Sequence, residues 1–351
     1  MKKSLIAVLV LALVGFGGLI FTFLRLSSSD RLADKSKSLE TEKILIGFSL
    51  GTSREERWLK DAEFFMERAN ELGAIVEVKY SGEDPDFQIS QAENLIIQGA
   101  KALVVVPNDA VTAARIVEKA HAAGVKVIAY DRMITGSDVD LYISFDGRKL
   151  GELQALEITR LVPKGKLAYI GGSPTDNNAF LLKEGSMKVV DPLVKKGDIM
   201  VVLDTFSLNW QPEEAYKALR AYLDTGKTVD AVIAANDSTA GGAVRALKEF
   251  GLEGKVPVSG QDADLAACQR IVVGTQAMTI YKPLKMLAYT AAEAAVDFAM
   301  GKIPLINGTL NNGKTDVPSH FLDPVVVTKE NMDAIIIDAG FHSREDVYGA
   351  R

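Results

Sequence analysis

A repeated alternation of short apolar runs with longer amphipathic stretches constrains the fold of this 351-residue chain more than any other feature. The apolar runs are rich in valine, isoleucine and aromatic residues, which predicts β-strands, and the stretches between them have helical periodicity. The stretch 54–73, for example, places Trp58, Ala62 and Phe65 on one face and ends at Gly73. Strands that alternate with helices in this way favour parallel sheets covered by helices.

The strands fall into two similar series. The first comprises residues 44–50, 74–80, 102–107, 125–130 and 141–146, and the second comprises 166–172, 199–206, 230–236, 256–262 and 277–281. A TIM barrel also alternates strands and helices, but here the pattern pauses over residues 142–166 and then restarts. We therefore expect an α/β protein with two doubly wound parallel-sheet domains, a multi-strand hinge and a ligand cleft between them.

The domain boundaries follow from the two series and from the helix and tail that come after them. Residues 44–146 together with about 283–310 are expected to form the N-terminal lobe. Residues 147–282 together with about 311–351 are expected to form the C-terminal lobe.

The N-terminus predicts a membrane-directed segment. Residues 1–26 contain an uncharged run from Leu5 to Leu24, preceded by two lysines. This length suits a membrane span of about 20 residues better than a signal core of about 7–15 residues, although cleavage near the serines at 27–29 stays an alternative. The polar segment 27–43 is expected to be a tether. Both interpretations place the remaining chain outside the cytoplasmic membrane, in the periplasm or at the cell surface.

Polar side chains follow most of the predicted strands. Ligands bind beyond the carboxyl ends of the strands in open parallel sheets, so two facing domains would bring these residues into one cleft. The residues at these positions are Arg54, Arg57, Trp58, Asp131, Arg132, Asp176, Asn177, Asn178, Asn209, Trp210, Asn236, Asp237, Gln261, Asp262, Asp264 and Lys282.

Each of these residues also has an interpretation without a ligand. Asp131 and Arg132 alone suit a surface ion pair equally well, and the two tryptophans suit a core. Asp237 precedes a helical stretch and is expected to be its N-cap. Asn236 is better placed to face a cleft. Polar groups recur after successive strands, and this regularity favours a shared binding site over a set of unrelated structural roles.

The combined chemistry of these strand ends indicates a sugar. Carboxylates, amides and arginine can engage neighbouring hydroxyl groups in pairs, and an indole can pack on the apolar face of a pyranose. No nucleophile stands with a base, so catalysis is not expected. The single cysteine, Cys268, and three dispersed histidines make a metal site or cofactor unexpected. A net charge of -6 argues against a nucleic-acid partner.

A resemblance to a known family adds to this interpretation. The segments ERWLKD, AYDRMI, YISFD, GELQA, GGSPTDNNA, SGQDADLA, TIYKP and TLNNGKTDVPS resemble the periplasmic sugar-binding proteins of the ribose and galactose type. The resemblance runs from about residue 43 to about 345, and it is greatest to the members that bind D-xylose. It implies a type I periplasmic binding fold with a pentose held between two hinged domains.

The resemblance also implies site residues. Asp131, Arg132, Asn236 and Asp262 would clamp ring and hydroxyl oxygens, and the two tryptophans would sandwich the sugar ring. The segment 51–55 departs from the family pattern, so no contact is assigned to it. The expected ligand-binding residues are Arg57, Trp58, Asp131, Arg132, Asn178, Trp210, Asn236, Asp262 and Lys282.

The resemblance leaves the ligand and the biological output open. Ribose, arabinose and galactose are alternatives to D-xylose as the ligand. A family member of this kind would serve an ABC transporter permease. A member that stays tethered by its N-terminal helix would instead report to a membrane sensor histidine kinase. A lac-repressor-type regulator shares the bilobed fold but needs a helix-turn-helix of about 60 residues where this chain has its apolar run.

Overall fold

The computed structural model describes residues 43–349, and all of them except Lys43 belong to one unit that begins at Ile44. None of the helices in this part of the chain is both long and apolar enough to cross a membrane. The apolar run 5–24, predicted as a signal or anchor, lies outside the described residues, as does nearly all of the expected tether.

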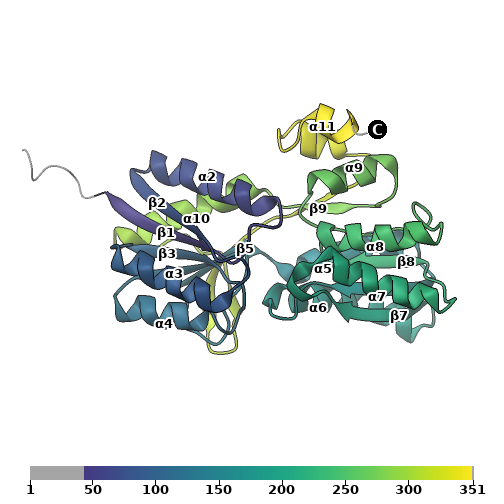
Figure 1. The fold of residues 1–351 in the computed structure, drawn as a ribbon, viewed down its shortest axis with the longest axis horizontal. Coiled ribbons are helices and arrows are strands. Elements are labelled where there is room, and N and C mark those ends of the chain that lie inside the picture. The colour runs from purple at the N-terminus through teal and green to yellow at the C-terminus, as the bar shows by residue number, and fades with distance from the viewer. Residues whose placement is uncertain (1–42, 350–351) are drawn as a thin grey trace, which may run out of the picture. The chain divides into compact units, whose positions relative to one another are not determined.

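The described residues alternate strands and helices as the sequence predicts (Figure 1). The strands are β1 Ile44–Leu50, β2 Ala74–Tyr80, β3 Ala102–Val106, β4 Lys126–Tyr130, β5 Leu141–Phe145, β6 Gly165–Gly171, β7 Ile199–Phe206, β8 Ala231–Ala234, β9 Thr279–Tyr281, β10 Gly308–Asn311, β11 Asp316–Leu322 and β12 Val325–Val327. The α-helices are α2 Arg57–Glu71, α3 Pro85–Ile97, α4 Ala114–Ala122, α5 Gly147–Leu161, α6 Asn177–Lys195, α7 Pro212–Asp224, α8 Asp237–Glu249, α9 Leu265–Val273, α10 Leu284–Ala299 and α11 Arg344–Gly349.

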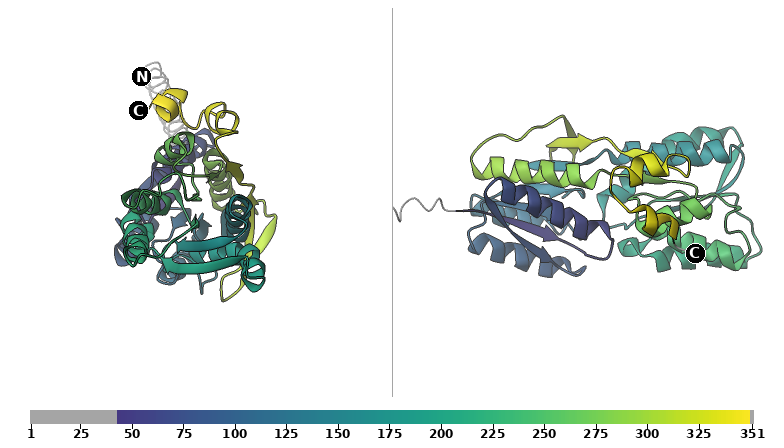
Figure 2. Two further views of the ribbon diagram at one scale, coloured as in Figure 1. Left: turned by 90° about the vertical axis from the view of Figure 1, so that its right-hand side faces the viewer. Right: turned by 90° about the horizontal axis from the view of Figure 1, so that it is seen from above.

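The first lobe is built on a seven-stranded sheet in the order β10-β11-β5-β4-β3-β1-β2. Strands β1 to β5 pair in parallel, as expected. Alternate residues of β3 enter different cores: Val104 packs with α2 and α10, while Val105 packs with α3 and α4. Because both faces are covered, the strand is apolar throughout. Figure 2 shows α2 and α10 side by side on one face of this sheet.

The second lobe is built on the three-stranded parallel sheet β7-β6-β8. Helices α7 and α8 supply one of its cores, and α5 and α6 supply the other. The predicted strand at 256–262 is wrong, because only Val258 forms a bridge, to Val232. Beyond Val258, the Ser259 hydroxyl bonds to both the N–H and the carbonyl of Ala234 at the end of β8. This side chain thus takes the place of the backbone hydrogen bonds that a longer strand would make to β8. Strand β9 also leaves the parallel sheet and pairs antiparallel with β12.

The tail corrects one predicted boundary. Strand β11 pairs in parallel with β5 of the first sheet, so residues 311–322 lie with the first lobe rather than with the second. This placement covers the edge of β5, which would otherwise be open to pairing with another chain. The chain passes between the lobes after β5, after β9 and after β11.

Candidate functional site

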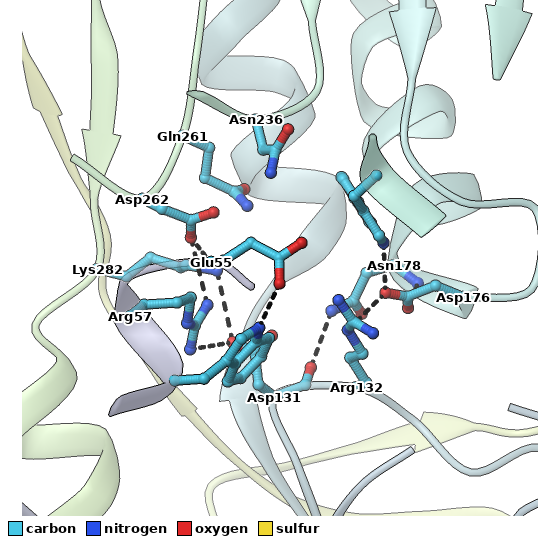
Figure 3. A pocket seen from close by; sticks show the side chains of 12 residues that line it. Glu55, Arg57, Asp131, Arg132, Asp176, Asn178, Asn236, Gln261, Asp262 and Lys282 are labelled. Atoms are coloured by element: carbon cyan, nitrogen blue, oxygen red, sulfur yellow. Dashed lines mark hydrogen bonds and ion pairs between the residues drawn. The ribbon is translucent and has the colours of Figure 1, made fainter. Parts of the chain in front are cut away.

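One cavity between the two lobes is lined by all nine residues that the sequence proposes for ligand contact (Figure 3). The first lobe contributes residues at the start of α2 and after β4. The second contributes residues after β6, β7 and β8 and from the loop beyond Val258, and Lys282 follows β9 where the chain crosses back. The lining residues are Glu55, Arg57, Trp58, Asp131, Arg132, Asp176, Asn178, Trp210, Asn236, Gln261, Asp262 and Lys282.

A sharp turn after β4 aims Asp131 and Arg132 at different partners. Asp131 adopts a left-handed backbone conformation with φ of 60°. Its carbonyl oxygen accepts hydrogen bonds from the hydroxyl of Tyr142 at 2.8 Å and the amide of Asn178 at 2.9 Å. This turn breaks the strand alternation that would otherwise point neighbouring side chains to opposite faces.

Two carboxylates and two cations from both lobes form a buried cluster. Asp131 lies 2.8 Å from Arg57 and 3.4 Å from Lys282. Asp262 lies 3.2 Å from Arg57 and 2.8 Å from Lys282. All four side chains are nearly inaccessible to solvent. Because a buried charge is costly unless it is paired, each of these side chains lies against groups of opposite charge.

Burial and neighbouring charges shift the pKa values of Asp131 and Arg57. Burial alone would raise the pKa of Asp131, but the charges of Arg57, Lys282 and Arg132 outweigh it and hold this pKa at about 2. Burial lowers the pKa of Arg57, yet Asp131, Asp61 and Asp262 raise it well above its ordinary value. The site therefore presents fixed charges, with acceptors and donors for neutral hydroxyl groups.

A second polar contact crosses the cavity beside this cluster. The Arg132 Nε lies 2.9 Å from Asp176 Oδ2, which also accepts a hydrogen bond from Trp210 Nε1 at 3.1 Å. Burial raises the pKa of Asp176, and Arg132 opposes that rise. Asp176 thus orients both an arginine of the first lobe and a tryptophan of the second.

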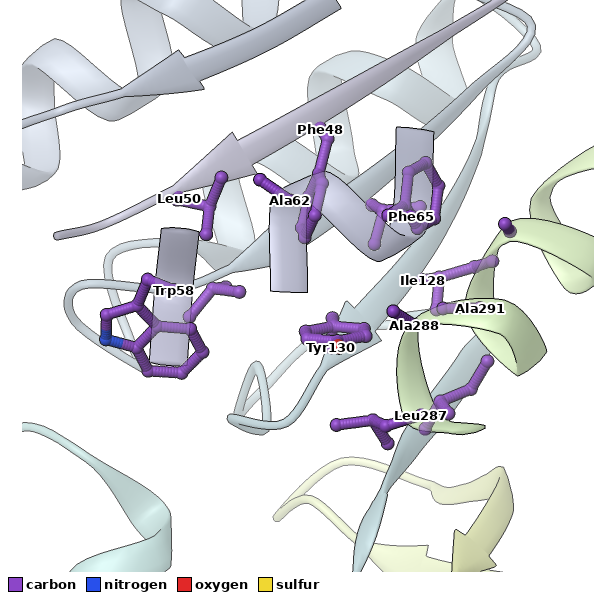
Figure 4. Packing of buried hydrophobic residues seen from close by; sticks show 14 of the residues in the cluster. Phe48, Leu50, Trp58, Ala62, Phe65, Ile128, Tyr130, Leu287, Ala288 and Ala291 are labelled. Carbon is purple, nitrogen blue, oxygen red and sulfur yellow. The ribbon is translucent and has the colours of Figure 1, made fainter. Parts of the chain in front are cut away.

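The two tryptophans supply flat apolar walls. Trp58 lies at one end of the first-lobe core (Figure 4), and its Nε1 donates to Glu55 at 2.7 Å. The guanidinium carbon of Arg57 lies 4.3 Å from the Trp58 ring centroid. The Trp210 indole packs directly on Gly172, where a β-carbon would overlap the ring. Contacts within its own lobe hold each ring: Glu55 bonds to Trp58, and Asp176 and Gly172 fix Trp210.

The amide residues of the second lobe correct one sequence prediction. Asn236, not Asp237, is the N-cap of α8, because its Oδ1 accepts from the backbone N–H of Thr239 at 3.0 Å. The prediction of Asp237 as the cap is therefore wrong. Asn236 keeps its amide group at the cavity wall.

The side chain of Gln261 also lines the cavity. Its buried Oε1 has no hydrogen-bond partner among residues 43–349.

Three lining residues were absent from the nine. Asp176 and Gln261 belong to the strand-end polar residues, but the resemblance to the family does not imply them as contacts. Glu55 lies in the segment set aside as atypical, although its position two residues before Arg57 and its contact with Trp58 place it in the wall.

The donor set determines what this cavity can do. Its lining residues, as the structure describes them, include neither a histidine, a cysteine nor a serine to act as nucleophile or base. Within residues 43–349, no group of three histidine, cysteine or acidic side chains is arranged to hold a metal ion. Charged acceptors, charged donors, amides and indoles suit reversible binding of a polyhydroxylated ligand.

The chain is similar to known proteins over most of its length. A family profile described as "Periplasmic binding protein domain" matches residues 46–303. The D-xylose-binding periplasmic protein of Haemophilus influenzae is 45% identical over 314 residues, covering 89% of this chain and 95% of the relative. The corresponding protein of Escherichia coli is 46% identical over 307 residues, covering 87% of this chain and 93% of the relative.

A solved structure shows the same fold. The carbohydrate transporter solute-binding protein of Chloroflexus aurantiacus, in complex with D-glucose, superposes with a TM-score of 0.82. It is 34% identical and covers 87% of this chain and 98% of its own.

Proposed function

Because the chain belongs to the periplasmic binding proteins, a family that binds its ligands without transforming them, we propose that it is an extracytoplasmic D-xylose receptor. The observation that carries the proposal is the single cavity that contains all nine expected contact residues from both lobes. The identity with two D-xylose-binding proteins over most of their length supports the choice of sugar.

The proposed binding mode follows from the chemistry of the cavity. Asp131 and Asp262 accept hydrogen bonds from sugar hydroxyls, and Arg57 and Arg132 donate to hydroxyl or ring oxygens. Charged partners make these bonds roughly twice as strong as neutral ones. Asn236 adds an amide that can donate.

The remaining expected contacts shape the pocket. The sugar ring lies between the indoles of Trp58 and Trp210, which cover its apolar faces. Lys282 and Asn178 are the positions that we expect to discriminate among sugars, because both line the cavity. Both also bond to Asp131, Lys282 at its carboxylate and Asn178 at its backbone carbonyl.

Closure of the lobes completes this site. The three chain crossings form a multi-strand hinge, about which the lobes rotate. Arg57 and Asp262 come from different lobes, as do Arg132 and Asp176, and these pairs lie at 3.2 Å and 2.9 Å. The described state is therefore closed, and opening must separate these pairs to admit the sugar.

A second ligand class is favoured by one specific observation. The solute-binding protein from Chloroflexus aurantiacus, 34% identical to this chain, holds D-glucose. A hexose, or another pentose such as ribose or arabinose, is therefore the alternative ligand.

Two outputs are compatible with the proposed receptor. It delivers sugar to an ABC importer, as expected from its similarity to a carbohydrate transporter solute-binding protein. If the run 5–24 is retained as an anchor, the tethered receptor instead reports its closed state to a sensor histidine kinase. Mass spectrometry of the mature N-terminus decides whether that anchor exists.

Isothermal titration calorimetry of the full-length protein, purified in a mild detergent, tests the proposed ligand. D-xylose should bind one to one and more tightly than D-ribose, L-arabinose or D-glucose. Tighter binding of D-glucose would favour the hexose alternative. The absence of heat with every one of these sugars would overturn the sugar-receptor function.

A further inference from the structure

Asp237 is a buried acid to which the proposed binding mode gives no role. It lies in the first turn of α8, where Asn236 already serves as the cap, and it is only 2% exposed. Burial raises the pKa of Asp237, with Arg270 opposing the rise and Asp262 adding to it. Capping does not explain the burial of Asp237. Asn236 is the cap of α8, and an aspartate that does cap a helix, Asp84 of α3, is exposed. The burial of Asp237 therefore calls for another explanation.

The segment facing Asp237 has a strained backbone. Asp262 and Ala263 have φ values of 100° and 54°, in the region that side chains other than glycine rarely adopt. Such conformations persist only where surrounding contacts hold them, and they cluster at functional sites. Here the strained residue Asp262 is the one whose carboxylate meets Arg57 and Lys282.

Contacts from Asp237 hold this segment in place. Its Oδ2 accepts hydrogen bonds from the backbone N–H of Asp264 at 3.0 Å and from the Thr279 hydroxyl at 2.8 Å. The same hydroxyl accepts from the N–H of Ala263 at 3.2 Å. The backbone N–H of Asp237 donates to the carbonyl of Gln261 at 2.9 Å. Asp237 therefore fixes the chain on both sides of Asp262.

The other oxygen of Asp237 is fixed as well. Its Oδ1 accepts from Gln276 Nε2 at 2.8 Å, and Arg270 donates to Gln276 Oε1 at 2.9 Å. Gly260 leaves the room for this arrangement, because a β-carbon there would overlap Asp237 Oδ1. Because both carboxylate oxygens of Asp237 are hydrogen-bonded, the side chain is fixed in one orientation, and it holds the segment around Asp262 in turn.

We propose that Asp237 is a positioning residue that acts with Thr279 to hold the strained segment 261–264, so that Asp262 reaches the sugar and the cations of the opposite lobe. This inference rests on the proposed sugar-receptor function and names a residue that supports it without touching the ligand. The Thr279 hydroxyl is the link that an experiment can cut with least disturbance, since valine has nearly the same shape.

The test compares Thr279→Val with Thr279→Ser in the full-length protein, by calorimetry with D-xylose. The valine variant should lose about tenfold in affinity, whereas the serine variant, which keeps the hydroxyl, should stay within about threefold of wild type. Asp237→Asn should lose at least as much as Thr279→Val. Asp84→Asn, which alters an exposed cap outside the network, is the control and should stay within about twofold.

A double-mutant cycle separates positioning from a general loss of stability. Thr279→Val should add less than about twofold in an Asp262→Ala background, because the side chain that it positions is gone. A full additional loss in that background would overturn the proposal, as would wild-type affinity in both Thr279→Val and Asp237→Asn. Failure of the wild-type protein to bind any sugar would instead refute the function on which the proposal rests, and the proposal with it.

Discussion

Replacing Asp131 by asparagine perturbs the charge cluster at its centre while nearly preserving the shape of the side chain. The change leaves Arg57 and Lys282 with one fewer buried carboxylate, since Asp131 lies 2.8 Å and 3.4 Å from them. A folded-state pKa of about 2 against an ordinary value of 3.8 corresponds to about 2 kcal/mol that favours the ionised, paired state. Removing one partner of a buried pair costs up to about 5 kcal/mol.

We therefore expect Asp131→Asn to lower the free energy of unfolding by about 2–4 kcal/mol in urea denaturation. Its affinity for D-xylose should fall about tenfold in calorimetry, because a charged acceptor becomes a neutral one. Asp204→Asn is the matched control, since Asp204 pairs with Lys183 on the surface at 2.7 Å. It should change stability by less than about 0.5 kcal/mol.

The same variant has a signature in its pH dependence. The pKa of Asp131 is depressed in the folded state, so its stabilising contribution is present above pH 3.8 and is lost as the pH falls towards 2. The stability difference between wild type and Asp131→Asn should therefore narrow over this range. A variant that matches wild type in stability and in affinity would show that Asp131 neither stabilises the cluster nor binds the sugar.

Three further changes probe the walls, the rim and the cations of the cavity. Gly172→Ala drives a β-carbon into the Trp210 indole, so affinity measured by calorimetry should fall at least about tenfold; unchanged binding would show that this ring is not a wall of the sugar site. Arg54→Ala cuts the rim contact to the Asn209 carbonyl of the other lobe, so stopped-flow dissociation should accelerate severalfold with little change in association; an unaltered rate would contradict a role in closure. Lys282→Met leaves the carboxylates of Asp131 and Asp262 facing one cation, Arg57, so D-xylose affinity should fall. Protonation of one carboxylate at lower pH relieves their repulsion, so affinity should partly recover there. A loss that does not depend on pH would argue against this electrostatic role.

Local rules could predict that polar residues at the strand ends would gather at one edge, whereas the choice of nine contacts among them came from the resemblance to the family. Apolar runs fix the strands, parallel pairing aligns their carboxyl ends, and the residue after each run therefore reaches a common edge. Asp131 and Arg132 follow this logic, and the structure places both in the cavity wall.

The remaining features depend on contacts between distant segments. Asn236 and Asp237 are both good capping residues. Asn236 caps α8, while Asp237 accepts from the backbone N–H of Asp264, a distant segment whose position the local sequence does not reveal. The run 256–262 has a strand-like composition, but the Ser259 hydroxyl takes over the ladder contacts and the chain turns away. The placement of β11 beside β5 likewise depends on an open sheet edge elsewhere in the chain.

Tryptophan fluorescence reports on the proposed sugar site itself, because the whole chain contains two tryptophans and both line the cavity. Titration of the full-length protein with D-xylose should change the emission saturably, at one sugar per chain and with the affinity that calorimetry gives. Emission that stays unchanged while calorimetry records binding would place the sugar outside this cavity and contradict the account.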